Sequence, residues 1–306
     1  MSNKIYLGLM CINNRLRKKD IFCSRSCIRR TFTVEKAKEL ALQNISDISE
    51  LIKWNIENNI HSLRVSSDLL PHYTDPEAES YTLDFAKEEL EKVGEYAKSV
   101  NQRLTFHPGQ FCQVGAKSAE IFEKTVDDLK MHCDIFDMMG LDENSIVNIH
   151  LGGMYGDKES SKRRWIEQFD DLPKNVKTRL TIENDEKCYS ARDCLEVAYE
   201  IGIPVVFDNH HYECYTKLHP DEEEQERVDV LLEEVVETWG DREVLCHISE
   251  QREGSKVGAH SDYITKLPEY YLEVPEIYNR DFWIDIEAKA KEDAILKLYS
   301  THSDIF

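Results

Sequence analysis

Short apolar runs alternate with longer amphipathic stretches along the whole chain. Runs of this kind, bounded by turn-forming residues, are typical of buried parallel strands, and the stretches between them show helical spacing. Strands are predicted at residues 5–12, 62–65, 103–107, 146–150, 179–183, 204–208, 244–248 and 282–286. Helices are predicted at 35–58, 84–100, 119–139, 160–169, 191–201, 221–239 and 288–299, and residues 260–278 are predicted to be irregular.

These alternating units predict one α/β domain that spans residues 1–306. Eight strand–helix units in a chain of this length are expected for a (β/α)8 TIM barrel. The alternative is an open doubly wound sheet followed by a separate tail domain. The chain lacks the G-x-G-x-x-G pattern after its first strand that would favour this alternative.

Residues that can bind metals stand where the predicted strands end. Six consecutive strands, the third to the eighth, lead directly into His, Asp or Glu, and in a barrel these ends meet at one mouth. Imidazole and carboxylate groups are ligands for divalent zinc, manganese or iron. The candidate ligands are His107, His150, Glu183, Asp208, His211, His247, His260 and Glu287. Because eight ligands exceed the need of one ion, we expect two or three ions, as in phosphoryl-transfer sites.

Charge and composition narrow the class of protein further. The formal net charge of −21 argues against nonspecific coating of nucleic acid. Residues 1–30, however, hold eight basic residues against Asp20 alone, so a local groove for a polyanion fits the sequence. Nine cysteines without a C-x-x-C pattern are typical of reduced thiols. No signal peptide or membrane helix is predicted, so we expect a soluble, intracellular protein.

The strand-end residues also form short motifs whose order resembles the UV damage endonuclease family, which is related to endonuclease IV. The motifs cover residues 66–72, 107–111, 148–153, 155–158, 180–185, 208–211, 247–249, 259–263 and 287–291. The resemblance implies a DNA repair enzyme that cuts double-stranded DNA immediately 5′ of UV photoproducts, and often of abasic sites. It also implies a 3′-hydroxyl and a 5′-phosphate as products. Manganese is the expected metal, with zinc and magnesium as alternatives.

The resemblance further implies a role for each ligand. His107, His150 and Glu183 would hold one ion, and Glu183 would bridge to a second ion. The remaining ligands of the second ion would be Asp208, His247 and Glu287, and His211 and His260 would hold a third. His72 would lie beside the cluster, in contact with it or with the scissile phosphate. The expected catalytic residues are Glu183, His72 and His107.

Residues that would contact DNA are expected in the loops at the same mouth of the barrel, some from the resemblance and the basic ones from their positions after the first and fourth strands. Gln110 and Phe111 come directly after a predicted ligand, and an amide with an aromatic ring can form a wedge that enters a weakened base stack. The alternative is that Phe111 simply caps the barrel mouth. The other expected contacts to DNA are Asn13, Arg25, Arg30, Tyr155 and Lys158.

Two positions depart from the family pattern. Leu245 stands where the family usually carries a lysine, which can be carboxylated, and Leu9 stands where it usually carries tyrosine. Because Leu245 and His247 are two residues apart on one strand, both should face the same side. Two other functions stay open from sequence alone: a sugar isomerase of the xylose isomerase type and a non-catalytic damage-binding homologue. The protein is expected to be a monomer.

Overall fold

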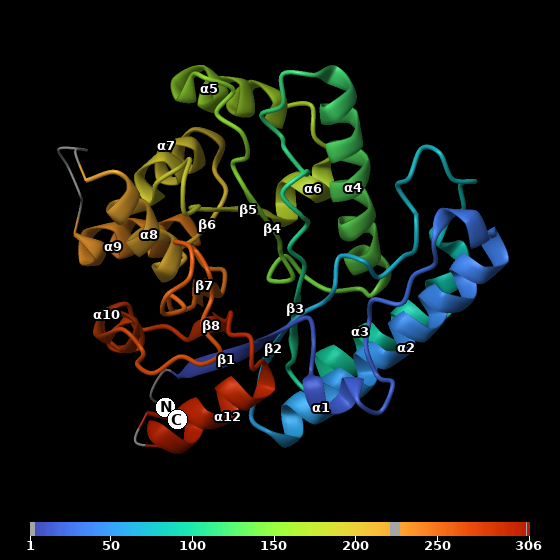
Figure 1. The fold of residues 1–306 in the computed structure, drawn as a ribbon, viewed down its shortest axis with the longest axis horizontal. Helices are drawn as coiled ribbons and strands as arrows, with labels where there is room; N and C mark the ends of the chain where they lie inside the picture. The colour runs from blue at the N-terminus through green and yellow to red at the C-terminus, as the bar shows by residue number, and fades with distance from the viewer. Residues whose placement is uncertain (1–3, 221–226, 304) are drawn as a thin grey trace.

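The computed structural model describes residues 4–220, 227–303 and 305–306. Its strands run parallel around a central axis, with helices outside them (Figure 1). The strands are β1 (Ile5–Met10), β2 (Ser62–Arg64), β3 (Arg103–Thr105), β4 (Val147–His150), β5 (Leu180–Glu183), β6 (Val205–Val206), β7 (Val244–Ile248) and β8 (Phe282–Ile286). The fold predicted from the alternating pattern, a TIM barrel, is confirmed.

The barrel closes through two narrow seams. Strands β3-β2-β1-β8-β7 form one sheet and β4-β5-β6 form another. A single bridge between Phe106 and Val147 joins β3 to β4, and a single bridge between Asp208 and His247 joins β6 to β7. The second seam places two of the predicted metal ligands side by side. The register of β4 on β5 does the same for His150 and Glu183.

Helices follow most strands and cover the barrel (Figure 1). The longer ones are α2 (Val34–Glu57), α3 (Lys87–Ser99), α4 (Ala119–Met138), α5 (Lys158–Phe169), α7 (Ala191–Ile201), α8 (Asn209–Leu218), α9 (Val228–Thr238) and α12 (Glu292–Thr301). The shorter ones are α1 (Asn14–Arg17), α6 (Lys174–Arg179), α10 (Glu269–Leu272), α11 (Val274–Ile277) and the 3-10 turns η1 (Arg29–Thr31) and η2 (Leu83–Ala86). Side chains of Thr33, Ser118 and Ser190 cap three of these helices by accepting backbone N–H bonds.

Several predicted boundaries need correction. The first strand ends at Met10 rather than residue 12, because Cys11 adopts a positive φ of 60° and turns the chain. The last helix begins at Glu292 rather than residue 288, after a turn in which Lys291 has a φ of 55°. Helices α1, α6, α8, α10 and α11 were not predicted, since they are short or mostly polar. The predicted helix at 221–239 is found as α9, and residues 221–226 of it lie outside the described residues.

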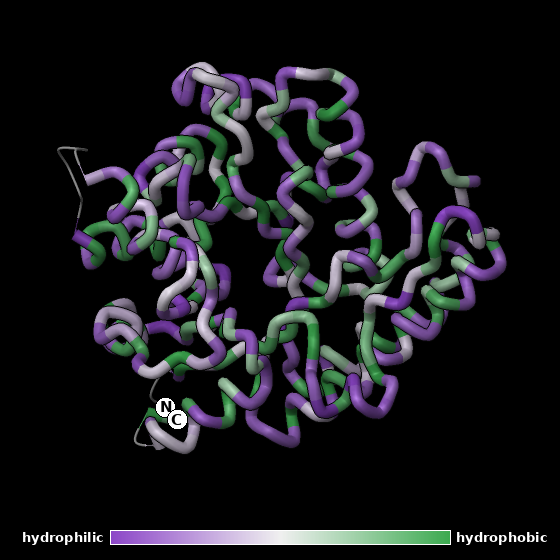
Figure 2. Tube along the Cα trace, in the orientation of Figure 1, coloured by the Kyte–Doolittle hydropathy of each residue, from purple (hydrophilic) through white to green (hydrophobic). Residues whose placement is uncertain are grey.

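Hydrophobic stretches recur along the strands and the helices that surround them (Figure 2). Within the strands, buried hydrophobic residues of the core alternate with buried polar residues such as Asn148, Thr181 and Asp285. Glycine is required at position 8 of β1, because side chains of β8 and β2 occupy the space that a Cβ would fill. A Cβ placed on Gly8 would lie 1.9 Å from Oδ1 of Asp285 and 2.8 Å from Cβ of Ser62. No described helix is long and apolar enough to cross a membrane.

A buried ion-pair network joins α5 to the start of α7. The Asp193 carboxylate accepts hydrogen bonds from Nζ of Lys158 at 2.8 Å and Nζ of Lys162 at 3.2 Å, and it also completes the cap with Ser190. Burial opposes ionisation of Asp193, but the hydrogen bond and charge of Lys158 outweigh it and lower the pKa of Asp193. The network therefore stabilises the fold only while this carboxylate is charged.

We expect Asp193→Asn to lower the free energy of unfolding by about 2 kcal/mol at pH 7. This loss is smaller than the loss expected on breaking a fully buried ion pair, because Lys158 is partly exposed. A carboxyl whose folded pKa is lowered stabilises above its unfolded pKa of about 3.9 and loses this contribution as pH falls. The difference between the two proteins in urea unfolding should therefore shrink below about pH 4. A difference that stayed constant between about pH 7 and about pH 3 would contradict this explanation.

Candidate metal centre

Glu183 is the centre of a cluster of imidazoles at the carboxyl ends of the strands. The side chain is fully buried at the end of β5. Its Oε2 lies 3.0 Å from Nε2 of His107 and 3.2 Å from Nδ1 of His247, and its Oε1 lies 3.1 Å from Nδ1 of His211. Asn148 of β4 donates a further hydrogen bond to Oε2. One carboxylate thus contacts side chains from β4, from β7, from the loop after β3 and from the start of α8.

The other predicted ligands extend this cluster. Oε1 of Glu287 lies 3.5 Å from Nδ1 of His247, and its Oε2 lies 3.7 Å from Nδ1 of His260. The His150 ring lies between those of His107 and His211, with centroid distances of 5.1 and 5.4 Å. Asp208 caps the start of α8, where its Oδ1 accepts the backbone N–H of His211. The structure therefore brings all eight predicted ligands to one mouth of the barrel.

Arg64 belongs to this cluster although the sequence reasoning missed it. It is the last residue of β2, and its Nη2 donates to Oε1 of Glu287. The same nitrogen lies 3.1 Å from Nε2 and 3.3 Å from Nδ1 of His247. The signal available in the sequence was an arginine inside a strand that is otherwise apolar or small. A buried cation in a ring of carboxylates contributes to their charge balance.

The pKa shifts in the cluster follow from burial opposed by close charges. Burial disfavours the charged form of Glu183, but His247 and His150 outweigh it and lower the pKa of Glu183 well below its usual range. Burial also opposes protonation of His211, yet the Asp208 and Glu183 carboxylates raise the pKa of His211 well above its usual value. Burial lowers the pKa of His107. The Glu183 carboxylate thus remains charged and requires cationic neighbours.

The donor set fits divalent metal ions. Two groups of ligand atoms each lie within 4.8 Å of one another: His107, His150 and Glu183, and then Glu183, Asp208 and His247. Glu183 belongs to both groups, as a bridging carboxylate would. Among the described residues, buried atoms without a hydrogen-bond partner include Oδ2 of Asp208 and Nδ1 of His150. Oε1 of Glu183 also has none, because the nearby Nδ1 of His211 donates to the carbonyl oxygen of Asn184 at 3.0 Å. Such orphaned polar atoms are costly unless a cation satisfies them.

Comparison with known proteins decides the family. The model of the family "UV-endonuclease UvdE" matches residues 5–305 of this chain. The chain belongs to this family. A putative UV-damage endonuclease from Acanthamoeba polyphaga mimivirus is 34% identical over 99% of this chain and 93% of its own length. The UV-damage endonuclease of Schizosaccharomyces pombe is 35% identical over 95% of this chain. The matched region covers 50% of the length of that protein.

Solved structures agree with this family assignment. The crystal structure of SacUVDE superposes with a TM-score of 0.84 at 28% identity and covers 98% of both chains. Endonuclease IV from Thermus thermophilus has a TM-score of 0.57 at 13% identity over 98% of this chain, which shows a shared fold alone. A D-psicose 3-epimerase has a similar TM-score of 0.54 at 12% identity over 82% of this chain. Fold by itself therefore does not separate nucleases from sugar epimerases, whereas the UvdE family match does.

His72, a predicted site residue, makes its hydrogen bonds within the loop that carries it and with the loop before η1. It has a positive φ of 56°, its Nδ1 lies 3.0 Å from Oδ2 of Asp75, and its Nε2 lies 2.6 Å from the carbonyl oxygen of Cys27. Both ring nitrogens thus face loop groups rather than the cluster. The left-handed turn at His72 orients the ring toward Asp75, and this turn could not be foreseen from the motif.

Three of the expected DNA contacts are engaged within the protein. Oδ1 of Asn13 caps α1, where it accepts the N–H groups of Arg15 and Leu16. Arg25 pairs with Asp47 at 2.7 Å. Lys158 donates to Asp193 and to the Tyr215 hydroxyl, each at 2.8 Å. Oδ1 of Asn13 and two of the three N–H groups of Lys158 therefore already have partners within the protein.

The other expected DNA contacts lie at the surface. Arg30 is exposed in η1, and Phe111 is 83% exposed on the loop after β3. Nε2 of Gln113 donates to the carbonyl oxygen of Gln110, while the Tyr155 hydroxyl donates to Oε1 of Gln113 at 2.6 Å. Tyr155 therefore braces the loop that carries Gln110 and Phe111. Phe111 does not cap the barrel mouth by packing into it, because most of its ring surface faces solvent.

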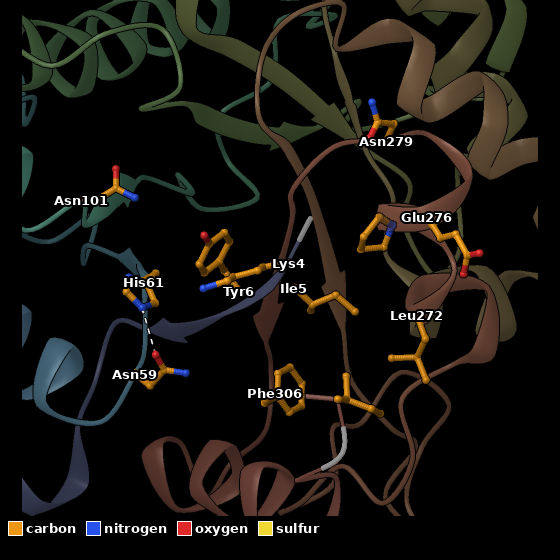
Figure 3. A pocket seen from close by; sticks show the side chains of 12 residues that line it. Lys4, Ile5, Tyr6, Asn59, His61, Asn101, Leu272, Glu276, Asn279 and Phe306 are labelled. Atoms are coloured by element: carbon orange, nitrogen blue, oxygen red, sulfur yellow. Dashed lines mark hydrogen bonds between the residues drawn. The ribbon is translucent and has the colours of Figure 1, made fainter. Parts of the chain in front are cut away.

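A large hollow lies at the opposite end of the barrel (Figure 3). Its volume is about 1020 Å³, and residues at or before the starts of β1, β2 and β3 contribute to its wall, including Lys4, His61 and Asn101. Nε2 of His61 and Oδ1 of Asn59 are joined by a hydrogen bond of 3.3 Å there. The amino ends of barrel strands serve stability rather than catalysis. We therefore place the active site at the imidazole cluster instead.

Proposed function

We propose that this protein hydrolyses the phosphodiester immediately 5′ of UV photoproducts in double-stranded DNA, and leaves a 3′-hydroxyl and a 5′-phosphate. The observation that carries the proposal is the Glu183 cluster at the barrel mouth of a member of the UvdE family. The names of the relatives from Schizosaccharomyces pombe and Clostridium perfringens support UV-damaged DNA as the substrate. Abasic sites are a second proposed substrate, and a monomer is the proposed state.

The chain's residues would hold two or three divalent ions. His107, His150 and Glu183 would hold one, and Glu183, Asp208, His247 and Glu287 would hold another, with His211 and His260 beside them. Bound divalent ions generate a nucleophile from water and stabilise both the attacking and leaving oxygens of a phosphate. The imidazole-rich donor set favours manganese or zinc over magnesium, which prefers oxygen ligands.

The protein's own groups orient the reaction. Asn148 and His107 fix Oε2 of Glu183, so that this carboxylate keeps one position at the centre of the site. The Glu183 and Glu287 carboxylates remain ionised because imidazoles and Arg64 lie against them. Arg64 also places a positive charge close to where the substrate phosphate would lie. These fixed charges would act without reorganisation when the phosphodiester is cut.

Phe111 and Gln110 are proposed to probe the lesion. The loop at residues 108–113 forms one wall of a hollow of about 290 Å³, and His150, Gly152, Gly153 and residues 185–188 form the other. His150 connects this hollow to the metal centre. An exposed aromatic ring beside a hollow next to the cleavage site can enter a weakened stack while a displaced nucleotide occupies the hollow.

We expect Phe111→Ala to lower the rate of nicking at a photoproduct by about 10-fold, because aromatic stacking on a base contributes about 1–3 kcal/mol. The free energy of unfolding should stay within about 0.5 kcal/mol, since the ring is exposed. Nicking rates on a duplex with one photoproduct measure the effect. Ile277→Ala, another exposed apolar side chain, is the control. Equal rates for Phe111→Ala and the control would contradict a probing role.

The proposed function is tested by mapping the products on a duplex with one cyclobutane pyrimidine dimer. With manganese, we expect a single cut 5′ of the dimer, a 3′-hydroxyl that a polymerase extends, and a 5′-phosphate that a ligase accepts. The undamaged duplex should stay intact. Cleavage of both duplexes alike, or tight binding to the damaged duplex without any cut under divalent metals, would contradict the proposal. The latter result would favour a non-catalytic damage-binding protein.

A further inference from the structure

Asp285 is a buried carboxylate beside the metal centre that the ligand set leaves unused. It lies on β8, and the register of β7 on β8 pairs it with His247. The side chain is 0% exposed, and neither of its carboxylate oxygens has a hydrogen-bond partner among the described residues. Burial of an unpaired carboxylate is costly, so this position needs a compensating donor or cation.

The neighbouring strand makes room for this carboxylate. Gly8 of β1 pairs with Asp285, and a Cβ on Gly8 would come within 1.9 Å of Oδ1. Ser62 of β2 borders the same space. Glycine in a strand interior lowers stability and often marks a site of close approach. A glycine within a strand and a buried, unpaired carboxylate each lower stability, and here the two residues are paired on neighbouring strands next to His247.

Ser62, Arg64 and Arg103 lie near Asp285, and the imidazole that approaches it is that of His247. Oδ2 of Asp285 lies 3.9 Å from Nε2 of His247, and a shift of about 1 Å would form a hydrogen bond. The other nitrogen of His247, Nδ1, faces the predicted ligands Glu183 at 3.2 Å and Glu287 at 3.5 Å. A histidine that binds a metal through one nitrogen usually donates the N–H of its other nitrogen to a carboxylate, a carbonyl or water.

We propose that Asp285 is a positioning residue that keeps the proton of His247 on Nε2 and leaves Nδ1 free to bind a divalent cation. This inference deepens the proposed function and rests on its metal centre. Arg64 cannot supply this selection, because its Nη2 is almost equally distant from Nδ1 and Nε2. Asp285 is the carboxylate on the Nε2 side of the ring.

Leu245, two residues before His247 on β7, offers no polar group to Asp285. Leu245 pairs with Trp283, one level below the pair of His247 and Asp285, and it is fully buried in the hydrophobic core. A lysine at 245 would reach up toward the level of His247, but the shorter apolar side chain of leucine supplies no polar group there. The carboxylate of Asp285 enters the same level from the neighbouring strand.

The test measures Mn²⁺ binding to the purified full chain by isothermal titration calorimetry. Asp285→Asn keeps the shape of the side chain, and we expect it to weaken the tightest Mn²⁺ site about 10–100-fold. Because the effect acts through His247, it should disappear in the His247→Ala background, where the double variant binds no more weakly than His247→Ala alone. Asp193→Asn, a buried carboxylate away from the cluster, should weaken unfolding stability but leave Mn²⁺ affinity unchanged.

The outcomes separate this inference from the proposed function. If the unchanged protein binds no divalent metal, the metal centre and this inference both fail. If the unchanged protein binds Mn²⁺ and Asp285→Asn binds it equally well, only the role of Asp285 is overturned. If Asp285→Asn weakens Mn²⁺ binding by the same factor in the unchanged protein and in the His247→Ala background, the role of Asp285 is also overturned. That result would indicate a general structural effect rather than one that acts through His247. Circular dichroism of each variant identifies any that fail to fold, and Asp285→Ser then replaces Asp285→Asn in the same cycle.

Discussion

Replacing Glu183 with glutamine should abolish nicking of UV-damaged DNA while the fold is kept. Glutamine has the same shape, but its neutral amide cannot serve as a bridge between two groups of ligands. Loss of a preorganised charge at an active site lowers rates by on the order of 10³-fold, and we expect at least this effect on the single-turnover rate. The neighbouring imidazoles should also lose the negative charge of Glu183 that attracts them. We therefore expect the affinity for Mn²⁺ to fall together with the nicking rate.

The control for this variant is Glu237→Gln, an exposed carboxylate on α9. It should nick damaged DNA at the rate of the unchanged protein. Circular dichroism and urea unfolding of Glu183→Gln should show a folded protein, because the substitution removes a buried charge without a change of volume. A folded Glu183→Gln variant with a nicking rate within a few-fold of the control would show that Glu183 is not the centre of the reaction.

Removal of divalent metals should be the second large effect. In excess EDTA, we expect no conversion of irradiated supercoiled plasmid to the nicked form, and addition of Mn²⁺ beyond the chelator should restore it. Binding to the folded state also stabilises it, by about 2.7 kcal/mol at a ligand concentration about 100 times the Kd. The melting temperature should therefore rise with Mn²⁺ concentration.

The melting measurement distinguishes the Glu183 centre from metals bound elsewhere. Glu183→Gln should melt at nearly the same temperature with and without Mn²⁺, whereas Glu237→Gln should show the full shift. Undiminished nicking in EDTA, or an equal Mn²⁺ shift for both variants, would contradict the assignment of the metal to this cluster.

Much of the fold was predictable from the sequence because the strands are buried on both faces. The predicted strands at 244–248 and 282–286 match β7 and β8, and the predicted helix at 191–201 matches α7. Helix α8 was not predicted, because His210, His211 and Tyr212 give it a polar start. It forms because Asp208 caps its first turn and the helix packs against β7.

The convergence of the ligands was predictable for a topological reason. In a barrel the carboxyl ends of all strands meet, so residues as distant in sequence as His107 and Glu287 can share one mouth. The direction of individual side chains could not be predicted from the sequence pattern. The turn that orients His72 toward Asp75 and the reach of Arg64 into the cluster both depend on backbone and side-chain geometry.

The most direct test of the central claim is an anomalous diffraction measurement on crystals of the protein grown with Mn²⁺, recorded at the manganese absorption edge. We predict at least two anomalous peaks at the barrel mouth, one in contact with His107, His150 and Glu183 and one in contact with Glu183, Asp208 and His247. A map with no peak beside Glu183, in crystals whose solution protein nicks damaged DNA with Mn²⁺, would contradict the account.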